Sequence, residues 1–427
     1  YKVLDFHESI EMAINSLESS YSRSDIELAF NEIQQLKKQG LLYSDDHYIN
    51  HVKNLKESKV VKALCLHVSH DCNLRCKYCF ASTGDFGMNR SIMPLEVAKA
   101  SIDYLIMNSK NRINLEVDFF GGEPLMNFDV VKETVNYARQ MEKKHNKKFR
   151  FTITTNALLL NDDNMNYINE NMYNIVMSLD GRKEVNDNVR IRVDGTGSYD
   201  SILPKILKMA DAREQSNYYV RGTFTRHNLN FSEDVLHLAE LGFKQISIEP
   251  VVAAKDTGMD IRKEDLNIIF EQYEELAKEY LNRQQQGKGF NFFHFMIDLA
   301  QGPCISKRLS GCGSGTEYLA ITPEGDIYPC HQFVGNESFK MGSVLQETPN
   351  DIRLDNDIYE KFKGCNVYNK EKCTNCWAKF YCGGGCAANA IQFNQNINEP
   401  YEIGCEMERK RVECAIWIAT KLSSLER

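Results

Sequence analysis

The distribution of cysteine constrains this chain more than any other feature of its sequence. Four of its 14 cysteines lie between Cys65 and Cys79, none lies between residues 80 and 303, and ten lie between Cys304 and Cys414. Disulfide-rich scaffolds are normally short secreted chains, whereas this chain has 427 residues and shows no signal-like apolar segment before its first predicted strand. We therefore expect reduced thiols, gathered in two separate regions of a cytoplasmic protein.

The segment between the two cysteine-rich regions predicts an α/β fold. Short β-rich runs alternate with longer helical patterns, which is typical of successive βαβ units and a parallel sheet. Six such units favour a partial barrel, and a doubly wound sheet is the alternative by pattern alone; in both folds, functional side chains lie at the carboxyl ends of the strands. The expected strands are Ala63–Ser69, Asn114–Phe120, Phe149–Thr155, Ile175–Leu179, Tyr218–Thr225 and Gln245–Glu249.

Charge and hydropathy exclude two classes of partner. The formal net charge of -8 argues against nucleic acid, because phosphate binding needs a basic surface. The sequence contains no run of about 18 apolar residues, so we expect no membrane span. The proportions of 42% hydrophobic and 26% charged residues are those of an ordinary globular protein.

Residues 1–60 form a separate helical segment. Ser24 and Glu27 have the spacing of a capping box at the start of a helix that ends at Gly40, and a second helical stretch runs from about His7 to Leu17. This pattern predicts a helix-turn-helix-like unit, which is either a helical extension packed on the sheet or a recognition module. DNA binding is not expected, because the segment holds 7 Lys or Arg against 10 Asp or Glu.

The first cysteine-rich loop, CNLRCKYCF, directly follows the first predicted strand. Cys72, Cys76 and Cys79 have the spacing C-x3-C-x2-C. Thiolates are the usual protein ligands of a 4Fe-4S cluster, and three of them on one loop leave one iron without a protein ligand. A zinc loop or buried thiols are the alternatives, and the position at a strand end favours the cluster.

This loop resembles the cluster-binding loop of the radical S-adenosylmethionine (SAM) enzymes. The resemblance implies that the open iron binds the amino and carboxylate groups of S-adenosylmethionine, whose reductive cleavage yields a 5'-deoxyadenosyl radical. It extends over the middle of the chain and implies cofactor contacts at the strand ends, although each such residue taken singly could instead be a helix cap or loop residue. The implied cofactor-binding residues are Gly121, Gly122 and Glu123 at the amino group, Ser178 and Asp180 at the ribose hydroxyls, Arg190 near the carboxylate, and Tyr78, Thr155, Asn156 and Glu249 with no specific group assigned.

The second cysteine-rich region resembles the SPASM extension of peptide-modifying radical enzymes. It contains CTNCWAKFYCGGGC, with the spacing C-x2-C-x5-C-x3-C, and a zinc ribbon would normally use four ligands rather than the seven cysteines found here. The resemblance implies two auxiliary 4Fe-4S clusters in a domain at 300–427 that ends in a helix. Cys373, Cys376, Cys382 and Cys405 would hold the outer cluster, and Cys312, Cys330 and Cys386 the inner one.

The fourth position of the inner cluster stays open at this point. Cys304 lies upstream in the spacing C-x7-C and either completes this cluster or leaves it with an open iron. Cys65, Cys365 and Cys414 match no motif and are expected to be structural thiols. His331 directly follows Cys330, where related sulfatase maturases have an Asp base; it is either a catalytic base or a histidine that only supports the cluster.

The order of the three segments resembles the maturases of six-cysteines-in-forty-five-residues (SCIFF) peptides. The expected domains are 1–60 for recognition, 61–299 for a partial (β/α)6 radical SAM barrel, and 300–427 for the SPASM domain. The resemblance implies a sactisynthase that joins a cysteine sulfur to an α-carbon of a Cys-rich precursor peptide. It also implies that a winged helix-turn-helix binds the peptide's leader, with strands expected upstream of Tyr1, and that flavodoxin or ferredoxin donates electrons.

Three other functions remain open from the sequence. A sulfatase-type maturase, which oxidises Cys or Ser to formylglycine, shares the barrel and the clusters. A non-enzymatic iron-sulfur electron carrier could also hold several clusters. A zinc-binding interaction protein would lack the brown absorbance of iron-sulfur clusters.

Overall fold

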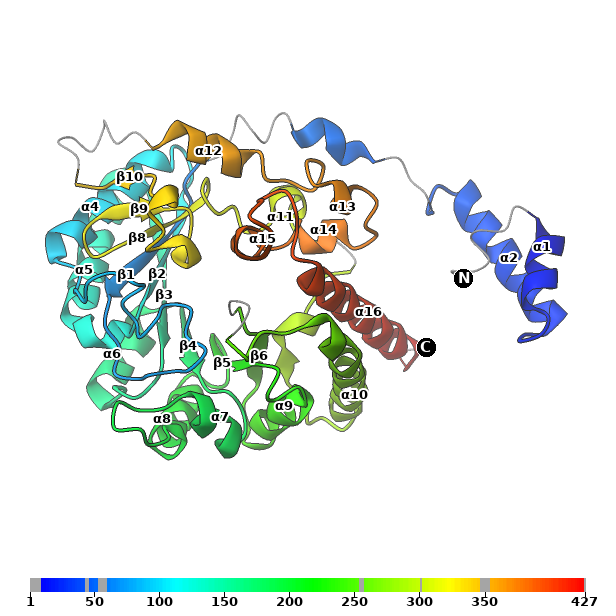
Figure 1. The fold of residues 1–427 in the computed structure, drawn as a ribbon, viewed down its shortest axis with the longest axis horizontal. Helices are drawn as coiled ribbons and strands as arrows, with labels where there is room; N and C mark the ends of the chain where they lie inside the picture. The colour runs from blue at the N-terminus through cyan, green and yellow to red at the C-terminus, as the bar shows by residue number, and fades with distance from the viewer. Residues whose placement is uncertain are drawn as a thin grey trace. The chain divides into compact units, whose positions relative to one another are not determined.

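The computed structural model describes residues 9–42, 46–52, 60–252, 257–299, 302–345 and 354–425. The chain divides into two compact units, Tyr1–Asn54 and Leu55–Arg427 (Figure 1). Within the described residues, no helix is both long and apolar enough to cross a membrane.

The first unit is a helical hairpin. Helices α1 (Ile10–Leu17) and α2 (Arg23–Lys38) bury Ala13 and Ile14 against Ile26, Phe30 and Ile33, and a short 3-10 turn follows at His47–Asn50. The described residues of this unit contain no strand.

The predicted cap of α2 was wrong by two residues. Ser22, not Ser24, precedes the helix: its Oγ accepts a hydrogen bond from the Asp25 backbone nitrogen at 3.2 Å, because its extended backbone directs the side chain at the first turn. The first helix begins at Ile10, and the expected start at His7 lies outside the described residues.

The second unit is built on one open, mostly parallel sheet. The strand order is β10-β9-β8-β1-β2-β3-β4-β5-β6-β7, and all pairs from β8 to β7 are parallel. The six predicted strands are confirmed as β1 to β6, while β7 extends one edge and three strands from the C-terminal third extend the other. The bounds are β1 Ala63–Ser69, β2 Asn114–Gly121, β3 Lys148–Thr155, β4 Asn174–Ser178, β5 Tyr218–Phe224, β6 Gln245–Pro250, β7 Asn291–Phe292, β8 Tyr318–Ile321, β9 Asp326–Tyr328 and β10 Gly342–Ser343.

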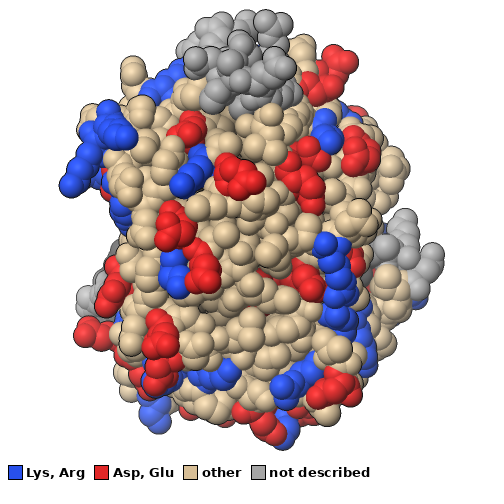
Figure 2. Space-filling view, turned by 90° about the vertical axis from the view of Figure 1, so that its left-hand side faces the viewer, with Lys and Arg blue, Asp and Glu red and all other residues tan. Residues whose placement is uncertain are grey.

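Helices of the αβ units line the outer side of the curved sheet (Figure 1). The bounds are α4 Leu95–Asn108, α5 Phe128–His145, α6 Asp162–Asn171, α7 Lys183–Val189, α8 Tyr199–Ala212, α9 Phe231–Glu240 and α10 Leu266–Gln285. The C-terminal region adds α11 Ile305–Ser310, α12 Asn356–Lys363, α13 Glu371–Thr374, α14 Lys379–Cys382, α15 Ala387–Asn394 and α16 Glu402–Leu425. Over α4 and α5, acidic and basic side chains are interspersed on the surface (Figure 2).

The side chains of β1 point alternately into two different hydrophobic cores. Leu64, Leu66 and Val68 belong to the large core that includes the residues of α4 and α5, whereas Cys65 belongs to a second cluster with Tyr328 and Phe362 of the C-terminal region. Successive side chains of a strand point to opposite faces, so one strand serves both cores. The inner face of the sheet is thus the face on which the two cysteine-rich regions meet.

Candidate functional site

A pocket of about 210 Å³ opens at the carboxyl ends of the strands. The loop that follows β1 forms one wall, the ends of β2 to β6 form another, and the turn after β9 completes it. This is where a parallel α/β fold places its ligands. The predicted residues on its lining are Cys72, Cys76, Tyr78, Cys79, Gly121, Gly122, Thr155, Asn156, Ser178, Arg190, Glu249 and His331.

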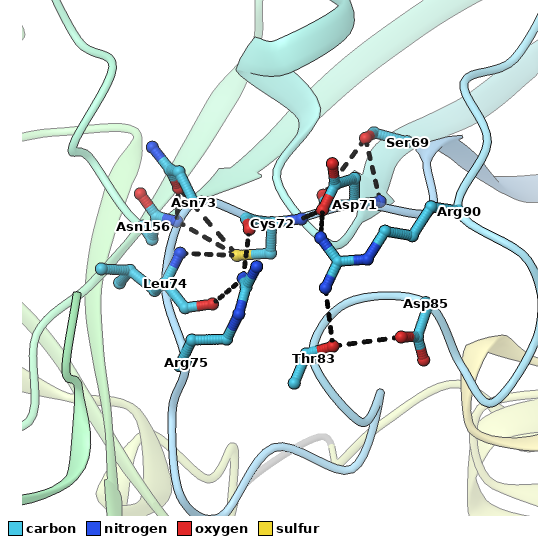
Figure 3. Close-up of polar contacts among 10 residues, drawn as sticks. All are labelled: Ser69, Asp71, Cys72, Asn73, Leu74, Arg75, Thr83, Asp85, Arg90 and Asn156. Carbon is cyan, nitrogen blue, oxygen red and sulfur yellow. Dashed lines mark hydrogen bonds and ion pairs between the residues drawn. The ribbon is translucent and has the colours of Figure 1, made fainter. Parts of the chain in front are cut away.

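Two N–H groups point at the sulfur of Cys72 (Figure 3). The Leu74 backbone nitrogen lies 3.4 Å and the Asn156 Nδ2 atom 3.5 Å from the Cys72 Sγ atom, and the Asn73 Oδ1 atom holds that amide at 2.7 Å. Burial raises the pKa of the Cys72 thiol to about 12, while both donors lower it. The donors favour the thiolate, which is the form that binds iron.

Polar contacts and glycine hold the cysteine loop in place. Arg90 bridges the loop, 2.6 Å from the Asp71 carboxylate and 3.1 Å from the Thr83 hydroxyl (Figure 3). At Gly122 a Cβ atom would lie 2.2 Å from the Asp71 carbonyl oxygen, so no larger residue fits without moving the loop. Gly121, whose φ is +128°, likewise lies too close to Ser69 for a larger residue. The glycines of FFGGEP therefore seat the loop against the end of β2.

The three thiols of the cysteine loop face one space. Cys72, Cys76 and Cys79 all line the same pocket. Thiolates are the usual protein ligands of an iron-sulfur cluster, in which each would bind a different iron. The donor set thus fits such a cluster.

Glu123 lies behind the pocket rather than on its lining. Its side chain is buried and accepts hydrogen bonds from the Leu125 nitrogen, the Thr155 hydroxyl and the Asn156 nitrogen at 2.8–3.0 Å. Burial raises the pKa of Glu123 to about 7. The carboxyl group thus fixes the turn that directs the Asn156 amide at Cys72.

Asp180 also lies behind the pocket wall, where it positions two pocket residues. It is fully buried, accepts a hydrogen bond from the Tyr78 hydroxyl at 2.7 Å, and lies 3.0 Å from the Arg190 Nε atom. The Thr223 backbone nitrogen is its third partner, at 2.9 Å. The Arg190 guanidinium carbon stands 5.6 Å from the centre of the Tyr78 ring. Arg190 is therefore a fixed positive charge suited to a carboxylate.

Two pocket residues on β5, Arg221 and Thr223, were missed from the sequence. They share one face of the strand because they are two residues apart, and both line the pocket. Arg221 lies 3.9 Å from Glu249, which also contacts His294 at 3.4 Å. Burial alone would raise the pKa of Glu249, but its interactions with His294, Arg221 and Arg411 hold that pKa well below its usual range. The alternation of β5 was the signal that could have identified both residues.

His331 closes the pocket as a neutral imidazole. Its ring lies 5.1 Å from the ring of Phe120 and 5.6 Å from that of Phe80, and its Nδ1 atom is 3.5 Å from the Tyr318 hydroxyl. Burial and the Arg221 charge lower its pKa to about 4. The structure thus places His331 on the lining of the pocket.

The four cysteines predicted for the outer cluster line one cavity of about 330 Å³. Cys373 and Cys376 come from the start of the motif, Cys382 ends α14, and Cys405 lies on α16. Three cations, Lys372, Lys379 and Arg409, and two acids, Glu402 and Glu408, also line the cavity. Four thiols on one cavity are the donor set of a 4Fe-4S cluster.

The three cysteines predicted for the inner cluster also lie near one another. Burial and the neighbouring thiols of Cys386 and Cys312 raise the pKa of Cys330. Cys304 is exposed and directly precedes α11. Cys65 and Cys414 are buried, as expected of structural thiols, and Cys365 is half-buried; all 14 cysteines are free of disulfides.

Comparison with known proteins identifies two domains. The radical SAM superfamily model matches residues 66–233, and the SPASM iron-sulfur cluster-binding domain model matches residues 312–377. A cysteine-type anaerobic sulfatase-maturating enzyme of Clostridium novyi is 24% identical over 78% of this chain and 89% of its own length. The subtilosin biosynthesis protein AlbA of Bacillus subtilis is 21% identical over 77% of this chain and 67% of its own.

The fold is similar to that of a protein of known structure. Native anSMEcpe with bound AdoMet superposes with a TM-score of 0.70 at 18% identity, covering 86% of this chain and all of that one. A second structure of anSMEcpe, with AdoMet and the Kp18Cys peptide, gives a TM-score of 0.68 at 17% identity over 85% and 99% of the two chains.

Proposed function

We propose that this chain, which joins a radical SAM domain to a SPASM iron-sulfur domain, forms thioether crosslinks in a ribosomally made precursor peptide. The bond joins a cysteine sulfur to the α-carbon of another residue. Both reacting groups lose hydrogen: the α-carbon loses a hydrogen atom, and the thiol loses a proton and one electron. The product is therefore two hydrogens lighter for each crosslink.

The proposal rests on one observation. Cys330, which belongs to the inner cysteine group, directly precedes His331, which lines the pocket. A substrate thiolate near the inner group would therefore lie beside the pocket that holds Cys72, Cys76 and Cys79. A substrate thiolate bound to an iron of the inner cluster would already be deprotonated, so no strong base would be needed. A site that needs no strong base is compatible with the neutral imidazole of His331. The sulfatase-maturing relatives are expected to have a carboxylate base at this position.

Different residues of the chain would bind different parts of the cofactor. Three 4Fe-4S clusters and S-adenosylmethionine, when bound, supply electrons and a 5'-deoxyadenosyl radical that removes hydrogen from carbon. Cys72, Cys76 and Cys79 would hold the first cluster, and Arg190 would pair with the cofactor carboxylate. Ser178 and the loop at Gly121 lie where ribose and the amino group could be bound, while Glu123 and Asp180 position their neighbours.

The remaining partners follow from the same proposal. The first unit would bind the leader of the precursor peptide, which raises the concentration of the core at the pocket. The outer group of Cys373, Cys376, Cys382 and Cys405 would hold one auxiliary cluster and accept or relay electrons, and flavodoxin or ferredoxin would be the external donor. This places the enzyme in the cytoplasm.

Mass spectrometry of modified peptide tests the proposal. The Cys-rich peptide encoded nearest this chain's gene is incubated anaerobically with reconstituted enzyme, S-adenosylmethionine and dithionite. A thioether removes two hydrogens and one alkylatable thiol, and fragmentation locates the link at an α-carbon. The Cys72→Ala/Cys76→Ala/Cys79→Ala variant, which should give no product, is the control.

The relative from Clostridium novyi supports a second candidate, a formylglycine-forming maturase. Conversion of a cysteine to formylglycine exchanges sulfur for oxygen and is therefore distinguished by mass, whereas oxidation of a serine removes two hydrogens, as a thioether does, and mass alone does not separate it. An aldehyde that reacts with a hydrazide probe, with no link between residues, would establish this alternative and overturn thioether formation.

A further inference from the structure

A fully buried lysine contacts the segment that joins the outer and the inner cysteine group. Lys370 has 1% of its surface exposed and directly precedes α13, which carries Cys373. Its backbone oxygen accepts a hydrogen bond from the Cys373 nitrogen at 2.8 Å. Its Nζ atom donates to the Gly384 backbone oxygen at 2.6 Å. Gly384 lies in the turn from Cys382 of the outer group to Cys386 of the inner group, so Lys370 contacts both the outer motif and the link to the inner one.

The ammonium group of Lys370 has no acid to balance its charge. Within the residues that the structure describes, its Nζ atom forms no ion pair with a carboxylate, and the Gly384 oxygen is its only hydrogen-bond acceptor. An ammonium group has three N–H donors, so two are left without a protein acceptor. Lysine is almost never fully buried unless it is paired, because moving an unpaired charge out of water is costly. A bound anion is therefore expected to balance this charge.

The two cysteine groups are where such an anion would be held. Burial raises the pKa of Cys373 and of Cys386, and the positive charge of Lys370 opposes that rise at both thiols. The ammonium group thus acts on one cysteine of each group. A 4Fe-4S cluster held by thiolates carries net negative charge, and the charge around a cluster is one of the factors that set its reduction potential. Reduction adds a further negative charge, which a buried cation stabilises more strongly than an exposed one.

We propose that Lys370 is a buried counter-ion shared by the two auxiliary clusters, and that its charge raises the reduction potential of both. Reduction of either cluster takes up one electron, and no bond or proton of Lys370 changes. A higher potential favours acceptance of the electron that crosslink formation would release. The inference rests on the cluster sites of the proposed function, and it does not depend on the thioether reaction.

A redox titration of the reconstituted full-length enzyme tests the proposal. The clusters are reduced stepwise with dithionite and followed by electron paramagnetic resonance, and the signal missing from the Cys72→Ala/Cys76→Ala/Cys79→Ala variant identifies the first cluster. Lys370→Gln removes the charge but keeps N–H donors for the Gly384 oxygen. At a fixed potential, it should lower the ratio of reduced to oxidised form about tenfold at both auxiliary clusters, a shift of about 59 mV to lower potential. The first cluster should not shift.

Lys372→Met is the matched control, because it removes the same charge from an exposed position. Lys372 lines the outer cavity, but its side chain is 51% exposed and lies 3.1 Å from Glu402. Solvent and the acid screen such a charge, so the ratio should change less than about threefold at either cluster. Equal shifts in Lys372→Met and Lys370→Gln would show that burial of the charge does not matter, and would overturn the proposal.

Iron content separates the loss of charge from the loss of a cluster. If Lys370→Gln keeps its iron, an unchanged potential at either auxiliary cluster overturns the shared role. If Lys370→Gln loses auxiliary iron, Lys370→Arg, which keeps the charge, is compared with it: retained iron supports the counter-ion, and lost iron overturns it. If the potentials shift as expected and the mass spectra show no thioether, only the proposed function fails.

Discussion

Asp180→Asn is expected to destabilise the second unit by about 3–5 kcal/mol, the usual consequence of removing one partner from a buried ion pair. Asp180 is fully buried and the Arg190 side chain is 10% exposed. Asparagine has the same shape, so no cavity forms, and Oδ1 can still accept from the Thr223 nitrogen. The loss therefore reports mainly the uncompensated Arg190 charge, together with the altered contact to the Tyr78 hydroxyl. Urea unfolding of the metal-free proteins, followed by circular dichroism, measures it.

An exposed ion pair provides the matched control. Asp162 and Lys208 lie 2.7 Å apart with side chains 74% and 58% exposed, so Asp162→Asn should change stability by less than about 1 kcal/mol. Adding Arg190→Met to Asp180→Asn removes the stranded charge and should restore part of the loss. The reasoning is refuted if Asp180→Asn costs no more than Asp162→Asn, or if the double variant is as unstable as the sum of the single ones.

Three further predictions address the cofactor, the peptide and pH. Replacing Cys72, Cys76 and Cys79 together by Ala should abolish cleavage of S-adenosylmethionine, seen by chromatography, while iron remains on the other cysteine groups; persisting cleavage contradicts the assignment. Removing residues 1–60 should weaken precursor-peptide binding in anisotropy titrations without stopping uncoupled cleavage, and unchanged affinity rejects the recognition role. Burial and the neighbouring Glu116 raise the pKa of Asp118 to about 7. The folded state thus binds this proton more tightly than the unfolded chain, and stability falls as pH rises from about 4 to about 7. Asp118→Asn should then stabilise the protein by up to about 4 kcal/mol at pH 8 and little at pH 4 in urea unfolding; an equal effect at both pH values contradicts this.

The sheet and the gathering of the cysteines were predictable because they depend on patterns along the chain. The β1 strand, Ala63–Ser69, for example, is mostly apolar and is buried throughout. The four cysteines of the outer group share one cavity, as the resemblance to the SPASM extension implied.

The direction of individual side chains was harder to predict. Glu123 and Asp180 stand at strand ends, as expected of pocket residues, yet both point behind the pocket wall. A shift of one residue in strand register moves a side chain from the pocket lining to the far side of the pocket wall. A sequence pattern defines register least well at the ends of strands. Arg221 was missed for the same reason, since its inward direction depends on where β5 pairs with β4.

The parallel pairing of β8 with β1 bears on how the protein is made. Ribosomal synthesis proceeds from the N-terminus, so β1 emerges long before its partner at Tyr318–Ile321. Until then one edge of a fully buried strand stays unpaired, and long-range parallel pairing forms slowly. The nascent chain therefore exposes a hydrophobic edge through most of its synthesis, and chaperone binding would protect it from aggregation.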